Sequence, residues 1–227
     1  MAGGVRAAVW ILLVTALMVQ VVLSVQLHGL RPAIEEMPPP PSPMAMKAVA
    51  LGDDQFLYRV VTQWLEDVGD GGGRLRPLRD FDYDRVVAWL KLTDDLDPRS
   101  DAVFQLGSTY YGALTDPSTA ARKVARLVDY FERAGMADPA ARWQWLSWAA
   151  TRNQQLVKDP GLARRTAMDL LSLRTSPTAP SWLPLLAIPL LRVSGDNAEA
   201  EELISDPDMI ERRRIAIEKL KQNEGRP

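Results

Sequence analysis

Residues 90–114 read "LKLTDDLDPRSDAVFQLGSTYYGAL": one helical pattern, a corner at Asp97-Pro98, and a second helical pattern. Aspartate suits the start of a helix because its carboxylate accepts the unpaired N–H groups of the first turn. Proline fits the first helical position, and the residue before a proline avoids the α conformation. The same dipeptide recurs at 116–117, 138–139, 159–160 and 206–207. We therefore expect these corners to mark the beginnings of successive helices.

Between the corners, the apolar residues follow the period of an α-helix. Phe56, Val60 and Trp64 fall four residues apart, and later segments repeat this spacing. The pattern predicts helices at 54–68, 82–96, 100–114, 118–134, 140–157, 160–173, 180–193, 196–204 and 207–222. Because no segment shows sustained alternation with a period of two, the expected fold class is all-α.

Two segments depart from this simple pattern. Residues 180–193, "PSWLPLLAIPLLRV", are apolar nearly all round but too short to cross a bilayer. They predict a buried, kinked helix with Pro184 in its first turn and Pro189 at the bend. Residues 69–74, "GDGGGR", lack the Lys-Ser/Thr of a phosphate-binding loop and follow a helix, so they predict a flexible interhelical loop.

Composition gives little support for catalysis. The net charge is -2, which provides no electrostatic reason to expect a nucleic acid partner. The chain has no cysteine, and His28 is its single histidine, so Cys- and His-based catalytic or metal sites are not expected in the globular region. Acidic clusters such as Asp80, Asp82 and Asp84 are interpreted as helix caps, although an acid-lined cleft was the alternative. We expect no cofactor and no enzyme activity.

The N-terminus predicts a membrane anchor. Residues 7–27 are free of charge, and a helix of this length reaches about 30 Å, the thickness of the hydrocarbon core. The basic residues on its two sides favour, weakly, a C-terminal domain outside a bacterial inner membrane, in the periplasm. The alternative is a cleaved signal peptide with Ser24 near the processing site. The anchor is favoured because the apolar stretch is longer than a usual signal core.

A proline-rich segment follows, and it is expected to be a spacer. Residues 31–47 hold six prolines between 32 and 43, which favours extended polyproline II conformation. Such a segment can hold a domain some tens of ångströms from a bilayer. The alternative, a ligand for an SH3-type domain, is less favoured beside a bacterial membrane.

Residues 82–111 resemble a junction of the tetratricopeptide repeat (TPR) family. Leu96, Asp97 and Pro98 match the end of that family's second helix, and Leu106, Gly107 and Tyr110 match its next first helix. Gly107 would allow two helices to approach closely. From Pro98 to Pro139 the repeat is 41 residues rather than about 34, so the resemblance is to a degenerate, TPR-like form. Residues 51–90 are also similar to uncharacterised bacterial membrane-anchored proteins.

The resemblance implies an α-solenoid of antiparallel helix pairs that binds protein partners. The expected organisation is an anchor at 1–30, a linker at 31–47, a TPR-like domain at 48–222 and a tail at 223–227. The expected function is a membrane-tethered scaffold or assembly factor, and the alternative is an accessory subunit of a larger membrane complex.

Four residues are candidates for partner contact. Trp143 lies in the aromatic cluster "RWQWLSWAA" (142–150) but points away from Trp145 and Trp148, so it is either buried against a neighbouring helix pair or an exposed binding anchor. The other candidates are Tyr111, Arg122 and Arg126. The basic clusters are interpreted chiefly as solvated helix faces, with an acidic partner or lipid headgroups as the alternative.

Overall fold

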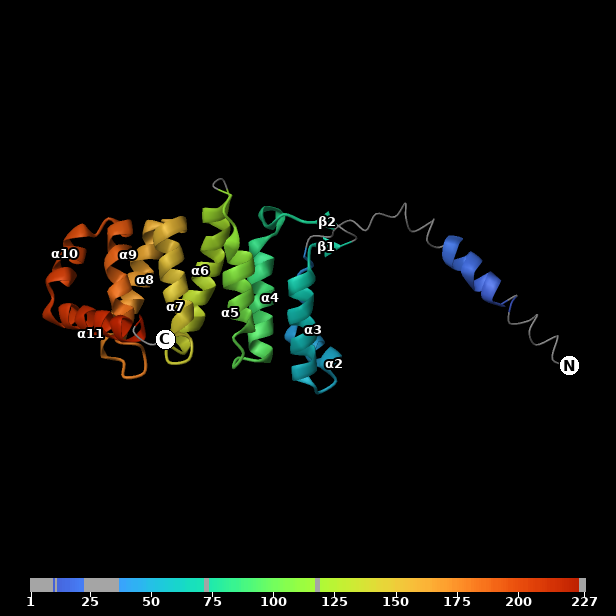
Figure 1. Ribbon diagram of the computed structural model, residues 1–227, viewed down its shortest axis with the longest axis horizontal. Coiled ribbons are helices and arrows are strands. Elements are labelled where there is room, and N and C mark those ends of the chain that lie inside the picture. Colours follow the sequence, from blue (N-terminus) through green and yellow to red (C-terminus); the bar gives the residue numbers. More distant parts are fainter. Residues whose placement is uncertain (1–9, 11, 23–36, 72–73, 117–118, 225–227) are drawn as a thin grey trace. The chain divides into compact units, whose positions relative to one another are not determined.

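The computed structural model describes residues 10, 12–22, 37–71, 74–116 and 119–224 (Figure 1). The chain divides into two compact units, Met1–Glu35 and Glu36–Pro227. Each unit is described by itself below.

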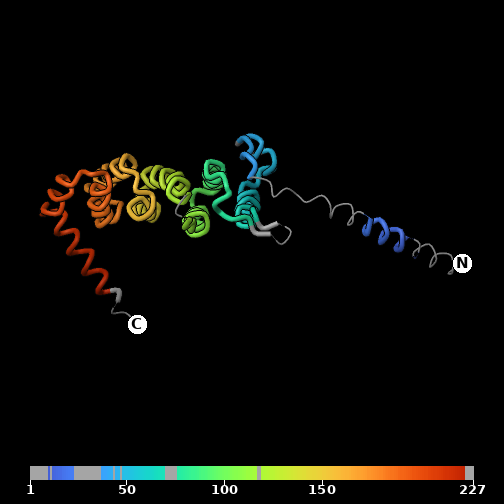
Figure 2. Tube along the Cα trace, turned by 90° about the horizontal axis from the view of Figure 1, so that it is seen from above, coloured from blue at the N-terminus to red at the C-terminus, as the bar shows by residue number. Residues whose placement is uncertain are grey.

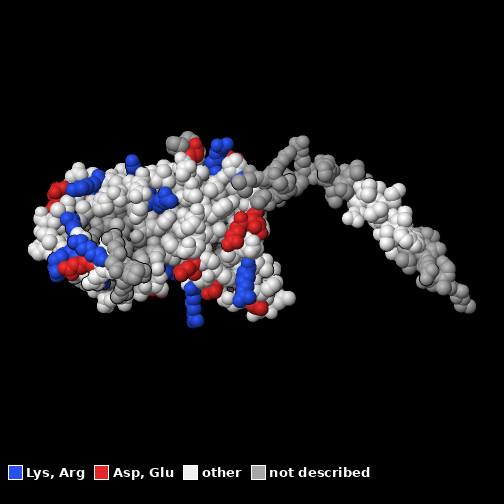
Figure 3. Space-filling view, in the orientation of Figure 1, with Lys and Arg blue, Asp and Glu red and all other residues white. Residues whose placement is uncertain are grey.

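In the first unit, residues 12–22 are helical, and their large apolar side chains are exposed. This segment carries neither acidic nor basic side chains (Figure 3). No helix within the described part of the chain is long and apolar enough to cross a membrane. The predicted span at 7–27 extends on both sides beyond the described residues and stays a prediction.

The second unit contains short and long helices and one minimal pair of strands. The α-helices are α2 (Pro43–Ala50), α3 (Asp54–Asp67), α4 (Tyr83–Leu96), α5 (Ala102–Gln105), α6 (Ala120–Ala137), α7 (Trp143–Arg152), α8 (Pro160–Ser172), α9 (Ala187–Ser194), α10 (Asn197–Ser205) and α11 (Pro207–Glu224). The 3-10 turns are η1 (Leu78–Asp80), η3 (Tyr111–Ala113), η5 (Leu173–Thr175) and η6 (Leu183–Leu186), and the π-helical turns are η2 (Leu106–Tyr110) and η4 (Asn153–Val157). The strands are β1 (Asp70–Gly71) and β2 (Arg74–Leu75).

Within this unit the helices stack in chain order from α3 to α9 (Figure 1). Seen from above, consecutive helices alternate between two layers, so that α4, α6 and α8 share one layer (Figure 2). Direct contacts of α6 with both α4 and α8 agree with this view. Each predicted helical segment contains helix, and the all-α class is confirmed. The predicted loop at 69–74 differs in detail, because β1 and β2 form a two-residue antiparallel ladder there.

The predicted linker was wrong over residues 37–47. Met37 and Met46 are buried in the core, and the compact unit begins at residue 36 rather than 48. Helix α2 begins where Ser42 Oγ accepts the N–H of Ala45 at 3.2 Å, with Pro43 at the first helical position. On sequence alone this serine and proline belong to the extended segment, because four consecutive prolines precede them. Residues 31–36 lie outside the described residues.

Four of the five Asp-Pro corners fall into two kinds, and Pro117 of the fifth lies outside the described residues. Asp159-Pro160 and Asp206-Pro207 begin α8 and α11 directly, with Asp159 Oδ1 accepting the N–H of Leu162 at 2.8 Å. Asp97 and Asp138 instead lie in turns, and the next helix begins only at Ala102 or Trp143. The dipeptide therefore marks these four corners, while the first helical residue depends on the turn that follows.

Residues 180–193 contain the buried helix that the sequence predicted, as a 3-10 turn that passes directly into an α-helix. Pro184 lies in the 3-10 turn η6, and Pro189 lies in the first turn of α9. A proline in the first turn sacrifices no intrahelical hydrogen bond, since the N–H there has no partner within the helix. Pro189 therefore causes no loss of a hydrogen bond within α9.

The buried residues in the described part of the chain form two clusters. The first, which we name the aromatic core, joins α2 to α7 and contains the rings Phe81, Tyr83, Trp89, Tyr111, Tyr130, Phe131 and Trp145. The second, which we name the aliphatic core, joins α7 to α11 and is built from leucine, alanine, isoleucine and methionine. As expected from the sequence, Gly107 permits a close approach: a Cβ there would lie 2.5 Å from Cζ of Phe131.

Candidate functional site

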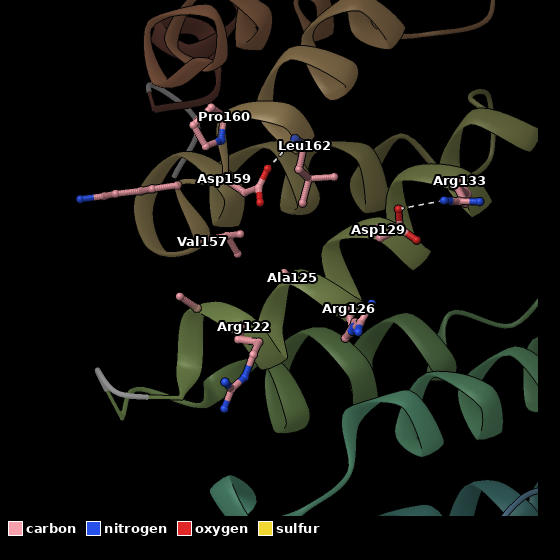
Figure 4. A pocket seen from close by; sticks show the side chains of 11 residues that line it. Arg122, Ala125, Arg126, Asp129, Arg133, Val157, Asp159, Pro160 and Leu162 are labelled. Atoms are coloured by element: carbon pink, nitrogen blue, oxygen red, sulfur yellow. Dashed lines mark hydrogen bonds and ion pairs between the residues drawn. The ribbon is translucent and has the colours of Figure 1, made fainter. Parts of the chain in front are cut away.

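A groove between α6 and α8 brings predicted contact residues together. It has a volume of about 630 Å³. Its lining comes from α6, from the end of η4 and from the start of α8 (Figure 4). The lining residues are Ala121, Arg122, Ala125, Arg126, Asp129, Arg133, Val157, Lys158, Asp159, Pro160 and Leu162. We name this hollow the α6–α8 groove.

The α6 wall follows from helical spacing. Arg122, Ala125, Asp129 and Arg133 recur every three or four residues, so they share one face of α6. Alanines on this face keep the groove open, while the opposite face of α6 is buried in the cores. The groove thus combines an aliphatic floor with charged walls.

The far wall is made by the corner before α8. Lys158 adopts a left-handed conformation, with φ of 52°, which ends η4 and turns the chain toward α8. Asp159 then caps α8 with one carboxylate oxygen. This sharp corner places a lysine, an aspartate and a proline in consecutive positions beside the groove.

Some of the charged side chains that line the groove form ion pairs, and others do not. Arg133 lies 3.1 Å from Oδ1 of Asp129, and Arg126 lies 3.0 Å from Oδ1 of Asp84. Arg122 and Lys158 make no ion pair with another described residue. These two cations, on opposite walls, are therefore available to an incoming group.

A buried carboxylate on α6 ties this helix to α8. Arg165 Nε donates to Oε1 of Glu132 at 2.8 Å, and the hydroxyl of Thr166 donates to the other oxygen at 2.5 Å. Burial raises the pKa of Glu132 above its ordinary value, and the bonds from Arg165 and Thr166 oppose that rise. The arrangement fixes α8 against α6 and so sets the width of the groove.

The structure brings together two of the four predicted contact residues. Arg122 and Arg126 are exposed, and both line the α6–α8 groove and a smaller pocket of about 240 Å³ next to α4. Tyr111 has 0% exposure, and its hydroxyl donates to the carbonyl of Leu65 at 2.9 Å. The predicted surface role of Tyr111 was therefore wrong, because the turn η3 directs this ring into the aromatic core.

Trp143 occupies an intermediate position. Its ring is half-buried and meets the ring of Trp182 edge to face, with centroids 5.6 Å apart. This packing is the first of the two alternatives that the sequence left open. Trp143 lies outside the residues that line the α6–α8 groove.

Sequence reasoning missed Lys158 and Asp159 as parts of a site. The signal was present in the Asp159-Pro160 corner, which was interpreted as a helix start only. Near α4, Asp82 caps the helix as expected, with its carboxylate accepting the N–H of Asp84 at 2.9 Å, whereas Asp84 forms an ion pair with Arg126. Among the described residues, no group of three or more His, Cys, Asp or Glu side chains could hold a metal ion.

Comparison of the chain with known proteins identifies no relative that could inform on this site. No protein-family model matches the chain, and searches of curated proteins and of solved structures give no significant match.

Proposed function

We propose that this protein is a membrane-tethered scaffold whose α6–α8 groove receives a segment of a protein partner. The observation that carries the proposal is the groove itself. It has a volume of about 630 Å³, an aliphatic floor and an available cation on each of its two walls. A peptide segment supplies both apolar side chains and hydrogen-bonding groups, so it matches such a lining.

The groove chemistry favours binding over bond making. Its lining residues carry guanidinium, ammonium, carboxylate and aliphatic groups, with no hydroxyl or imidazole among them. Arginine side chains are suited to partner contact because their planar donors form paired hydrogen bonds. The fixed Glu132–Arg165 contact provides a rigid base for such recognition.

The ordered two-layer stack supports a TPR-like solenoid as the finer description of the fold. The uncharged N-terminal stretch supports an anchor in a bacterial inner membrane, with the helical unit in the periplasm. Tethering would confine the groove near membrane-bound partners and raise their effective concentration without any new contact.

Photocrosslinking tests the proposal. A benzoylphenylalanine at position 122 is expected to trap a defined partner in intact cells, whereas the same group at Glu66, an exposed position on α3, is not. The matched variant Ala125→Trp fills the groove floor and is expected to abolish the crosslink from position 122 while the melting temperature is unchanged. Equal crosslinking from positions 66 and 122, or insensitivity to Ala125→Trp, would contradict the proposal.

A further inference from the structure

Residues 37–41 are rich in proline and begin with two residues bonded to α4, and we name them the proline strap. Met37 is 1% exposed and belongs to the aromatic core, whereas Pro38 and Pro39 are exposed to solvent. The strap therefore attaches through one buried apolar side chain and through its backbone.

Two side chains of α4 hold the backbone of the strap. Trp89 Nε1 donates to the carbonyl of Pro38 at 2.7 Å, and Arg85 Nη1 donates to the carbonyl of Met37 at 2.9 Å. Trp89 is itself fixed by Trp64 of α3, whose ring centroid lies 4.6 Å away. We name Trp64, Arg85 and Trp89 the indole platform.

The sequence of the strap explains why its carbonyls are available. Residues 37–40 each precede a proline, so each avoids the α conformation, and the prolines fix φ near the polyproline II value. A polyproline II segment has no internal hydrogen bonds. Its carbonyls therefore accept bonds from a partner surface at little cost in conformational entropy.

From this geometry we infer that the indole platform is a binding site for polyproline II segments, occupied by the chain's own strap. The ligand class is a large apolar residue followed by consecutive prolines: the apolar side chain enters the core, and two successive carbonyls meet Arg85 and Trp89. A proline-rich segment of another protein with this pattern can replace the strap. Replacement would release residues 37 and 38 from Arg85 and Trp89.

The inference is separate from the α6–α8 groove, since no residue of the indole platform lines that groove. It also revises the expected spacer, because the carbonyls of Met37 and Pro38 are held by specific donors. Length and composition alone gave no reason to expect this contact.

Methionine oxidation in the full-length chain tests the inference. Met44 is 82% exposed and serves as an internal reference for the buried Met37. With hydrogen peroxide, Met37 is expected to oxidise at least about tenfold more slowly than Met44, as measured by peptide mass spectrometry. Equal rates would overturn the inference, because the strap would not be bound.

Competition then tests binding of a separate ligand. A norleucine-Pro-Pro-Pro-Pro peptide, which cannot itself be oxidised, is expected to accelerate oxidation of Met37 when added in excess and to leave Met44 unchanged. A peptide with alanines in place of the prolines is the control and is expected to have no effect. If the proline peptide leaves the rate at Met37 unchanged, the platform is no polyproline site.

A conservative variant isolates the indole donor. Trp89→Phe keeps a large ring but removes the N–H, and it is expected to accelerate Met37 oxidation roughly three- to tenfold, the loss of one hydrogen bond. The circular dichroism spectrum checks that the helices are retained. A folded Trp89→Phe chain with unchanged protection of Met37 would refute the role of this donor.

Discussion

The aromatic core and the aliphatic core hold their helices together by different means. In the aromatic core, tyrosine hydroxyls donate to distant backbone carbonyls. The Tyr83 hydroxyl donates to the carbonyl of Tyr111 at 2.7 Å, and the Tyr111 hydroxyl donates to the carbonyl of Leu65 at 2.9 Å. Burial raises the pKa of both tyrosines, so their hydroxyls remain protonated donors. Directional bonds of this kind specify the register of α3, α4 and η3.

In the aliphatic core the directional contacts lie at the edge. Its interior is made of alanine and larger aliphatic side chains, whose packing is non-directional. Arg174 donates to Asp206 at 2.6 Å and to Asp208 at 3.1 Å, which ties η5 to the start of α11. The stability of the aromatic core therefore depends on the placement and hydrogen bonds of individual rings, whereas the stability of the aliphatic core depends on how completely its side chains fill the interior.

The largest expected effect comes from removing a ring at the centre of the aromatic core. Phe131 is fully buried and meets Phe104, Trp145 and Trp148. Phe131→Ala is expected to lower the free energy of unfolding by about 3–5 kcal/mol, because it leaves a cavity that rigid rings cannot close. The matched variant Leu190→Ala in the aliphatic core is expected to cost about 2–4 kcal/mol, since flexible neighbours relax more readily. Urea unfolding measures both, and a larger loss for Leu190→Ala would break the comparison.

Replacing glycine by alanine is expected to have opposite effects on stability at a tightly packed position and at an open one. Gly107→Ala places a Cβ against Phe131 and is expected to cost roughly 1–3 kcal/mol through overpacking. Gly161→Ala, in the first turn of α8, meets nothing closer than an Asp159 oxygen at 3.4 Å. It is expected to stabilise by up to about 1 kcal/mol, since alanine favours helix. Thermal unfolding of the two variants should therefore shift in opposite directions.

The two kinds of Asp-Pro corner predict different costs. Asp159→Ala removes the cap of α8 and is expected to cost about 1 kcal/mol. The carboxylate of Asp97 accepts only the N–H of Arg99 within a turn, at 3.2 Å, so Asp97→Ala is expected to cost less, about 0.5 kcal/mol. Equal losses in urea unfolding would show that both corners act as caps.

The smallest expected effect is a change in pH dependence at the junction of the two cores. Because the pKa of Glu132 is raised above 4.5, the folded chain keeps a proton that the unfolded chain loses as pH rises above that value. Stability is therefore expected to fall as pH rises through this window. Glu132→Gln cannot titrate, so the difference in unfolding free energy between the two chains should change with pH there. A difference independent of pH would contradict the raised pKa.

The sequence by itself determined the helical class and the order of the helices. Asp-Pro corners and the apolar period suffice for this because capping and amphipathicity are local properties, set within a few residues. The role of Gly107 was also predicted, since only a small residue suits a close helix contact.

Only the tertiary structure decided which side chains face outward and which distant segments meet. Tyr111 looked like a contact residue but is buried, because the direction of a ring depends on the turn η3 and on neighbours that are distant in the chain. The α6–α8 groove joins residues more than thirty positions apart, and the proline strap meets Trp89 across 51 positions. Such contacts depend on the summed packing of many elements, which no local pattern records.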